Sequence, residues 1–396
     1  MSKLPSLSRA RWLKEPSLQR VFSLVAEAGG EARVAGGAVR NALLGEPIGD
    51  IDIATTLPPQ KIMEVFKAAG LSVHPTGIEH GTVTVVVDHK PYEITTLRRD
   101  VVTDGRRAVV AFTDDWKEDA LRRDFTINAL FCDAHGKIHD YTNGYSDIRR
   151  KRIIFVGAPQ ARIKEDYLRI LRFFRFLAAY EKMTTDSASL SACVRLKKGL
   201  LGLSAERIAR EMFKLLVGPR AVPVLKLMAK HNVLKLIVPH TSEFRVLARL
   251  PPDPVLRAFV LAKKPLELRN MWRLSNEQAR RIELLLLLGS ALKPNWRENE
   301  QRRMLYAVGP QAWKGSVHLS WARSRAALTD RAWKRLLTLP SRWVVPSFPV
   351  TGRDLLDLGF PSGPDLGREL KRLEDYWVAS DFKSTKDELL ESIKGN

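Results

Sequence analysis

The feature that most constrains the fold is a change of sequence pattern near Gly157. Before it, short β-branched and alternating runs are separated by stretches with helical spacing. After it, apolar residues recur at helical spacing in 160–180 and again in 205–217, and no convincing β-run follows. The pattern predicts an α+β fold: a front part that mixes strands and helices, then an all-helical part.

The front part predicts short elements in quick succession. The expected helices are 20–28, 38–44 and a segment from Pro58 through Ala69, where proline suits the first turn. The expected strands are 32–35, 49–54, 82–88, 92–97 and 126–131, with 89–91 as a hairpin turn. Residues 98–117 are charged and follow neither period, so we expect a long loop, which in a compact domain is usually functional or mobile.

Charge is unevenly distributed along the chain. The 396 residues carry 65 Lys+Arg against 44 Asp+Glu, a net charge of +21. Residues 1–150 hold 20 of each sign, so the whole excess lies in 151–396. This asymmetry favours a neutral front half joined to a body that contacts phosphates. The alternative is a basic surface that serves solubility.

Other features exclude several classes of protein. Cys132 and Cys193 are too few for a disulfide framework or a Cys-rich zinc site. Residues 1–14 are basic but lack the apolar run of a secretory signal. The most apolar run, 282–292, contains Glu283 and is too short to span a membrane. We therefore expect a cytoplasmic protein with no membrane partner.

Asp50 and Asp52 form the first candidate site. They lie two apart on an expected strand, so both carboxylates would project from one face within a few ångströms. Hard oxygen ligands of this kind suit Mg²⁺ held jointly by protein and substrate phosphates. An Asp-x-Asp string alone is more often a solvated strand edge.

The residues around this pair make the signal more specific. Gly36 and Gly37 stand at an expected strand-to-helix turn, where backbone N–H groups are open to an anion, and Arg40 adds a cation one turn along. Together these residues describe a site for a metal-bound triphosphate. Glu93 is a candidate third carboxylate if its strand packs beside Asp50 and Asp52, in which case two metals could act on one displacement at phosphorus. The alternative is a solvent-facing strand residue.

Six strings carry a family resemblance. They are VAGGAVRNALLG (34–45) followed by Asp50-Ile51-Asp52, GIEHGTVTV (77–85), EITTLR (93–98), RRDFTINA (122–129), RIKEDYLRILRFFRF (162–176) and SAERIAREMFKLL (204–216). Together they resemble the motifs of the class II tRNA nucleotidyltransferases, which are the CCA-adding enzymes of the polymerase-β nucleotidyltransferase superfamily. Bacterial poly(A) polymerases share this architecture. The resemblance is dense over 30–217 and thins beyond.

The resemblance implies an architecture and a cofactor. The catalytic head would be a polymerase-β-like nucleotidyltransferase domain with a mixed β-sheet, and the cofactor would be Mg²⁺ bound by Asp50, Asp52 and Glu93. The implied domains are a head (1–157), a helical neck that binds the nucleotide base and RNA (158–220), a helical body (221–345) and a helical RNA-binding tail (346–396).

The resemblance also implies roles for single residues. Arg123 and Asp124 fall on the motif that contacts the ribose and triphosphate, and Asp166 and Arg169 fall on the helix that reads the incoming base. Asp166 and Arg169 are three apart, so on one helix they share a face and can offer an acceptor and a fork of donors to cytosine or adenine. No nucleic-acid template is then needed.

Arg172 and Arg175 continue this arginine stripe and could position the primer end or the phosphates. The alternative for the whole stripe is an ordinary helix surface with i,i+3 salt bridges. Further along, seven of the nine tryptophans follow residue 220, and most adjoin a cation. Such interleaving suits contact with RNA, although it also arises when Trp packs inward on amphipathic helices.

The sequence as a whole predicts an enzyme that adds CCA to the 3′ acceptor end of tRNA from CTP and ATP, with no DNA partner. A poly(A) polymerase and a CC-only or A-only enzyme are the nearest alternatives. A catalytically silent RNA-binding protein is an alternative of a different class.

Overall fold

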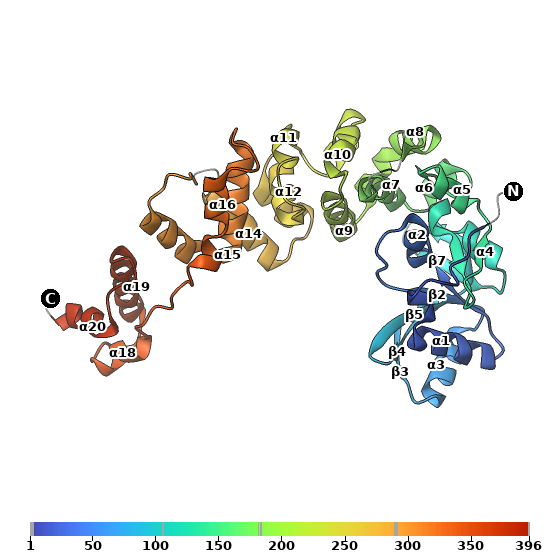
Figure 1. The fold of residues 1–396 in the computed structure, drawn as a ribbon, viewed down its shortest axis with the longest axis horizontal. Helices are drawn as coiled ribbons and strands as arrows, with labels where there is room; N and C mark the ends of the chain where they lie inside the picture. Colours follow the sequence, from blue (N-terminus) through green and yellow to red (C-terminus); the bar gives the residue numbers. More distant parts are fainter. Residues whose placement is uncertain (1–3, 105–106, 181, 183, 289–291, 395–396) are drawn as a thin grey trace. The chain divides into compact units, whose positions relative to one another are not determined.

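The computed structural model describes residues 4–104, 107–180, 182, 184–288 and 292–394. The chain folds as two compact units, Met1–Pro239 and His240–Asn396 (Figure 1). Every named strand of the described part belongs to the first unit, and the second unit is helical. The predicted change from an α+β front part to a helical remainder is therefore confirmed.

A seven-stranded mixed sheet organises the first unit. Its strands are β1 (Ala32–Ala35), β2 (Asp52–Thr55), β3 (Ser72–Gly77), β4 (Thr82–Val87), β5 (Lys90–Thr96), β8 (Leu130–Cys132) and β9 (Ile138–Asp140). The strand order is β3-β4-β5-β2-β1-β8-β9. The β2–β5 pair is parallel and the other neighbours are antiparallel. This sheet brings the start of β2 beside the middle of β5, where Asp52 and Glu93 are partners in register.

Helices cover the buried residues of the sheet, which alternate along β4 and run without a break through most of β1, β2 and β8. In β4 the side chains of Val83, Val85 and Val87 are buried, and the residues between them, Thr84 and Val86, are only partly buried. Helices α1 (Pro16–Glu27) and α3 (Pro59–Ala68) contact this strand, and α2 (Gly37–Leu44) contacts β1 and β8. The central strands β2 and β5, which carry the candidate site, are thus held in place by packing on a hydrophobic core.

Two predictions for the front part are wrong. Residues 98–117 do not form a loop, because β6 (Arg98–Asp104) and β7 (Arg107–Phe112) pair as an antiparallel hairpin, followed by α4 (Trp116–Leu121). Charged and β-branched residues follow one another without alternation there, so the sequence shows no strand period. The expected strand 126–131 begins only at Leu130, because Thr126–Asn128 forms a 3-10 turn, η3.

The rest of the first unit is mostly helical. Its elements are α5 (Gly144–Arg149), β10 (Arg152–Ile153), α6 (Pro159–Glu165), α7 (Leu168–Ala179), β11 (Thr184–Thr185), α8 (Ser187–Leu196), α9 (Ala205–Leu216) and α10 (Ala221–Lys230). The predicted helical stretch 160–180 is two helices. The short strand β11, which pairs in parallel with β10, lies after Gly157, where no strand was expected. Helix α7 buries Phe173 and Phe174 and contacts α9 and α10.

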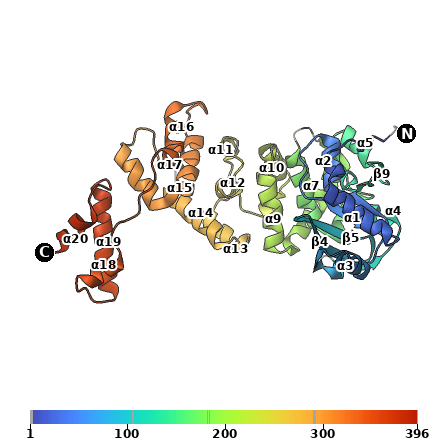
Figure 2. The same cartoon turned by 60° about the horizontal axis from the view of Figure 1, so that its bottom comes forward.

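The second unit is built from helices. They are α11 (Phe244–Leu247), α12 (Pro254–Leu261), α13 (Leu268–Met271), α14 (Asn276–Leu288), α15 (Glu298–Arg323), α16 (Arg331–Leu337), α17 (Leu339–Arg342), α18 (Gly352–Asp357), α19 (Pro364–Ala379) and α20 (Lys386–Lys394). Short 3-10 segments complete the chain at Trp12–Lys14, Ile78–His80, Lys197–Gly202, Leu234–Leu236 and Pro265–Glu267. Figure 2 shows α16 beside α15, in agreement with the contacts between these two helices, and α17 contacts α16.

Tryptophans form much of the core of the second unit. Trp313, Trp321 and Trp333 are buried in one cluster, and Trp377 is buried in another. For these residues the inward-packing alternative is correct. Within the described ranges, no helix is both long enough and apolar enough to cross a membrane, and residues 289–291 of the apolar run 282–292 lie outside those ranges.

Candidate active site

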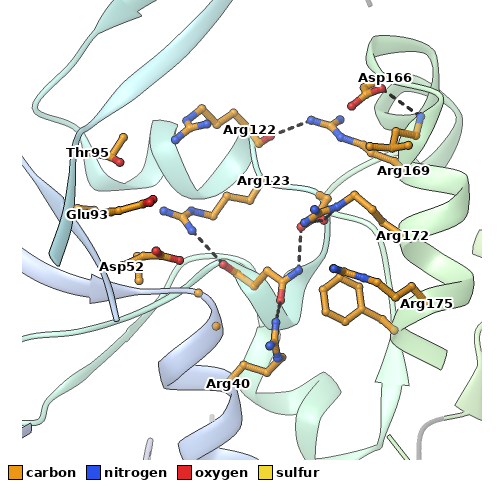
Figure 3. Close-up of a pocket in the computed structure, with 18 of the residues that line it drawn as sticks. Arg40, Asp52, Glu93, Thr95, Arg122, Arg123, Asp166, Arg169, Arg172 and Arg175 are labelled. Atoms are coloured by element: carbon orange, nitrogen blue, oxygen red, sulfur yellow. Dashed lines mark hydrogen bonds and ion pairs between the residues drawn. The ribbon is translucent and has the colours of Figure 1, made fainter. Parts of the chain in front are cut away.

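A cavity of about 850 Å³ in the first unit contains most of the predicted site residues (Figure 3). It lies where the start of α2, the strands β2 and β5, the segment after α4, and the helices α7 and α9 meet. Nine Arg and Lys residues and five Asp and Glu residues line it. This excess of cations suits a polyanionic ligand.

Gly36 and Gly37 form the turn between β1 and α2, as predicted. Gly36 has φ 63°, a left-handed conformation that favours glycine. A Cβ atom there would also lie 3.2 Å from Nη1 of Arg123 and 3.2 Å from the carbonyl oxygen of Asn128. A side chain at position 36 would therefore strain the backbone and crowd the cavity. Helix α2 begins at Gly37, so its N-terminal N–H groups lie at the cavity wall.

Arg40 is held in place by amides and aromatic rings. Its Nη1 donates to Oδ1 of Asn128, and its Nε and Nη2 donate to Oδ1 of Asn41 at 3.1 and 3.0 Å. The guanidinium lies over the rings of Phe176 and Tyr180. In the part of the chain that the structure describes, no carboxylate pairs with Arg40, so its charge is open to an anion.

Asp52 and Glu93 are neighbours across the parallel β2–β5 pair, which confirms that the two strands lie side by side. Partial removal from water and the charge of Glu93 raise the pKa of Asp52 above its usual value. The guanidinium of Arg123 opposes this shift, and the charge of Asp50 adds to it. Two carboxylates so placed repel each other unless a cation lies between them.

Asp50 does not share a strand face with Asp52, so that prediction is wrong. Strand β2 begins at Asp52, and Asp50 lies exposed in the irregular segment before it. Asp50 is not among the cavity-lining residues, although its charge acts on Asp52. The sequence between Gly45 and Asp50 contains Pro47 and Gly49, which disfavour an earlier start of the strand.

The carboxylates fit a divalent cation by their chemistry. Hard carboxylate oxygens are the donors that such cations prefer, and neither Asp52 nor Glu93 forms an ion pair among the described residues. A bound cation would offset the charge of Glu93, which helps to raise the pKa of Asp52. Among the described residues, no three His, Cys, Asp or Glu side chains converge closely enough to hold a metal ion by themselves. Substrate phosphate oxygens would have to supply further ligands.

Arg123 reaches the carboxylates because Asp119 holds it. Its Nε and Nη2 donate to Oδ2 of Asp119 at 3.1 and 2.9 Å, and its Nη1 donates to the carbonyl oxygen of Asn128 at 3.2 Å. Arg122 pairs with the other oxygen of Asp119 at 2.6 Å. Burial alone would raise the pKa of Asp119, but the charges of Arg123 and Arg122 outweigh it and lower that pKa.

Asp124 is buried, and both its oxygens are occupied. One accepts from Nδ2 of Asn128 at 2.9 Å and from its neighbouring backbone N–H, and the other accepts from Arg172 at 2.6 and 2.5 Å. Burial would raise the pKa of Asp124, but Arg172 and these hydrogen bonds lower it. Asp124 therefore joins α7 to the head, and Asn128 connects Arg40, Arg123 and Asp124.

Asp166 and Arg169 do not share a helix face, which corrects the prediction. Asp166 lies between α6 and α7 with extended backbone angles (φ −155°, ψ 106°). One of its carboxylate oxygens accepts from the N–H of Leu168 at 3.0 Å, and the other pairs with Arg207 of α9 at 2.7 Å. Both Asp166 and Arg169 nevertheless line the cavity, on the side opposite Asp52 and Glu93 (Figure 3).

The arginines of α7 pair with acidic side chains. Arg169 pairs with Glu165 at 2.5 Å and donates to the carbonyl oxygens of Arg162 and Arg122 at 2.8 and 3.2 Å. Arg175 lies 3.1 Å from the buried carboxylate of Glu211 and over the ring of Phe176. These contacts fix where the guanidinium groups point into the cavity.

The sequence did not single out Asp119, Asn128, Arg207 or Glu211 as site residues. Asn128 connects three cavity residues, Arg40, Arg123 and Asp124. Asp119 follows the i,i+3 and i,i+4 spacing to Arg122 and Arg123, which was a usable helical signal. No local signal connects Arg207 with Asp166, because 41 residues separate them.

Two family models match the chain. Residues 32–154 match the model described as "Poly A polymerase head domain". Residues 182–245 match the model described as "Probable RNA and SrmB- binding site of polymerase A". The first match covers the sheet and the carboxylate side of the cavity, and the second includes α9.

Relatives match over nearly the whole chain. The mitochondrial CCA tRNA nucleotidyltransferase 1 of Homo sapiens is 36% identical, and the match covers 96% of this chain and 92% of that protein. The corresponding Danio rerio protein is 34% identical, with 92% and 87% covered. A crystal structure of the Bacillus stearothermophilus CCA-adding enzyme in complex with CTP is 28% identical, has a TM-score of 0.79, and covers 96% of this chain and 98% of its own. The chain therefore belongs to the family of CCA-adding enzymes, the tRNA nucleotidyltransferases.

Proposed function

We propose that this protein adds CMP, CMP and AMP in turn to the 3′ end of tRNA, using CTP and ATP, releasing pyrophosphate and needing no nucleic-acid template. One observation carries the proposal: a single cavity holds Asp52 and Glu93 on one side and Asp166 and Arg169 on the other. The first pair suits transfer at phosphorus, and the second suits recognition of a base edge. Relatives named for CCA addition support it.

We assign the metal as Mg²⁺ and its ligands as Asp50, Asp52 and Glu93. When bound, the ion would lower the pKa of the attacking 3′ hydroxyl and offset the charge of the leaving pyrophosphate. Asp50 is included because its charge already acts on Asp52. Mg²⁺ is preferred because it is usually held by a few carboxylates together with substrate phosphates.

We assign triphosphate binding to Gly36, Gly37, Arg40, Arg123 and Asp124. The N-terminus of α2 and the unpaired charge of Arg40 attract the phosphates and orient them. Arg123 stands on the same side, facing the carboxylates. The part of Asp124 is to position the neighbouring cations, because its own oxygens are already bonded.

Base selection is assigned to Asp166 and Arg169, which offer an acceptor and donors from adjacent segments. Because Arg207 and Glu165 hold these two side chains, the recognising edge is fixed before the nucleotide binds. Arg172 and Arg175 follow along α7 and are assigned to positioning of the primer end or the phosphates. A fixed protein edge of this kind can select CTP and ATP without a template strand.

A poly(A) polymerase is the second candidate, because the model that matches 32–154 carries that description. Incubation of a tRNA lacking its 3′ CCA with CTP, with ATP and with both separates the cases by product length. Three added nucleotides, only with both substrates present, are expected. Long A tails would indicate a poly(A) polymerase. With both substrates present, a product that gains only two C residues or only one A would indicate a partial enzyme. Absence of Mg²⁺-dependent pyrophosphate release would indicate a silent RNA-binding protein.

Two further assignments belong to this proposal. We infer a head (1–157), neck (158–220), body (221–345) and tail (346–396), which limited proteolysis followed by mass determination of the fragments tests. We also infer a reducing compartment, with the cytoplasm as first candidate, because Cys132 and Cys193 are free and buried. The vertebrate relatives are named as mitochondrial, so imaging of the tagged chain decides between the two locations.

A further inference from the structure

A second basic cavity lies within the second unit, in the body (221–345), where no individual residue has yet been assigned to RNA contact. Its volume is about 490 Å³, and it is lined by α16, α17, the start of α15 and the segment that contains Trp296. Residues 240–350 carry 20 Lys+Arg against 8 Asp+Glu, so this part of the chain holds a strong excess of positive charge.

Three arginines line this cavity, and no carboxylate neutralises them. Within the described ranges, Arg331, Arg335 and Arg342 form no ion pair, although Arg342 donates to the carbonyl oxygen of Arg335 at 2.7 Å. The acidic residue of the lining, Glu298, pairs with Arg302 at 3.0 Å. Three guanidinium groups around one cavity repel one another, and a bound anion would remove that repulsion.

The nearest acid in sequence is also engaged. Oδ1 of Asp330 accepts from the N–H groups of Ala332 and Trp333 at 2.9 and 3.1 Å and so caps α16. This cap fixes the start of the helix that carries Arg331 and Arg335. The acid that could neutralise these arginines is instead part of the helix terminus.

Helix α16, which carries Arg331 and Arg335, is held firmly in the core of the second unit. On α16, Trp333 and Leu336 are buried, and the Trp333 ring stacks on Trp321 with an interplanar angle of 5°. The carbonyl oxygen of Leu336 accepts from the buried Nε1 of Trp313 at 2.9 Å. Exposed guanidinium groups on a fixed helix, beside the half-buried Trp296, form a prearranged surface.

We propose that this cavity binds phosphodiester groups of the tRNA backbone, an inference that rests on the proposed function. The planar fork of arginine fits phosphate oxygens in pairs. The cavity lacks the Asp and Arg pair that would read a base edge in the first unit, so binding here is independent of sequence. Free phosphate or a nucleoside triphosphate carries the same kind of phosphate oxygens. The experiment below distinguishes binding of these small anions from binding of RNA.

The experiment compares tRNA binding by the full-length protein and by a double variant, Arg331→Ala with Arg335→Ala, over a series of salt concentrations. Each lost phosphate contact lowers the slope of log K against log salt by about 0.9, and affinity falls roughly ten-fold per contact at 0.1 M salt. The matched control is Lys334→Ala, which removes an exposed cation of the same helix that does not line the cavity.

The expected result is a weaker and less salt-dependent tRNA complex for the double variant, with the KM for CTP unchanged at saturating tRNA. The double variant Arg331→Lys with Arg335→Lys should keep most of the slope, which separates an effect of charge from an effect of folding. The proposal is overturned if the double variant binds tRNA like Lys334→Ala, or if inorganic triphosphate binds at this cavity as tightly as tRNA does. Wild-type protein that adds no CCA would instead overturn the proposed function.

Discussion

Replacement of Asp52 by Asn should stabilise the metal-free protein while it abolishes nucleotide transfer. Asp52 and Glu93 are register partners on adjacent strands, which lie about 4.8 Å apart. Two like charges at that distance repel by roughly 1 to 3 kcal/mol at effective dielectric constants between water and a protein surface. Because Asp52 is only partly removed from water and Arg123 offsets part of the repulsion, the low end applies, about 1 kcal/mol.

A stabilisation of about 1 kcal/mol corresponds to a rise in Tm of roughly 2 to 4 °C for a unit of this size. The assay is thermal unfolding of wild type and Asp52→Asn in excess chelator, and then in increasing Mg²⁺. Mg²⁺ should raise the Tm of the wild type, because an ion that binds only the folded state stabilises it, and should leave the variant almost unchanged. Asp114→Asn is the matched control, since Asp114 is exposed and does not line the cavity.

Two outcomes would refute this reasoning. If Asp52→Asn melted below the wild type in chelator, repulsion between Asp52 and Glu93 would not be the dominant effect. If Mg²⁺ raised both Tm values equally, Asp52 would not be a ligand of the ion. The same samples, supplied with CTP and tRNA, should show pyrophosphate release only for the wild type and the Asp114 control.

Three other predictions concern the arginines. Asp119→Asn leaves Arg122 and Arg123 without their buried partner and should lower the free energy of unfolding by about 3 kcal/mol at neutral pH. The pKa of Asp119 lies below its usual value, so the difference in free energy of unfolding between wild type and variant should be full above about pH 4 and shrink as pH falls through the lowered pKa. If urea unfolding gave the same difference from pH 7 to 3, the prediction would be wrong. Arg169→Ala should reduce discrimination of CTP over UTP by roughly ten-fold or more, measured as the ratio of kcat/KM values, and an unchanged ratio would exclude its role in base selection. Affinity for tRNA should fall steeply with salt while CTP binding changes much less, and equal slopes would contradict the separation of the two sites.

The parts of the site that depend on neighbouring residues could be predicted from the sequence. The Gly36–Gly37 turn is such a part, because a left-handed φ and a following helix both depend on a few adjacent residues. The approach of Glu93 to Asp52 was predicted only conditionally, since it requires β2 and β5 to pair in parallel across the 34 residues between them. The sheet order that satisfies this condition could not be derived from either strand alone.

Asp166 shows why helical spacing was misleading for the base-reading pair. The apolar pattern of 160–180 continues through Asp166, so spacing alone predicts one helix. The break is stabilised by two contacts of the Asp166 carboxylate, one to the N–H of Leu168 at the start of α7 and one to Arg207 of α9. The second contact is tertiary. A sequence window cannot contain it, and an aspartate that accepts from a backbone N–H at a helix break is locally indistinguishable from one on a helix face.

The two cavities use arginine in different ways, which changes the meaning of the net charge of +21. In the first unit, Arg123, Arg172 and Arg175 are each paired with a buried carboxylate, so their contribution is geometry and little of their charge is free. In the second unit, Arg331 and Arg335 are exposed on a rigid helix and have no such partner among the described residues. Paired and buried charges respond weakly to ionic strength, whereas exposed and unpaired charges respond strongly. Nucleotide selection and RNA affinity should therefore be separable by salt alone, without any substitution.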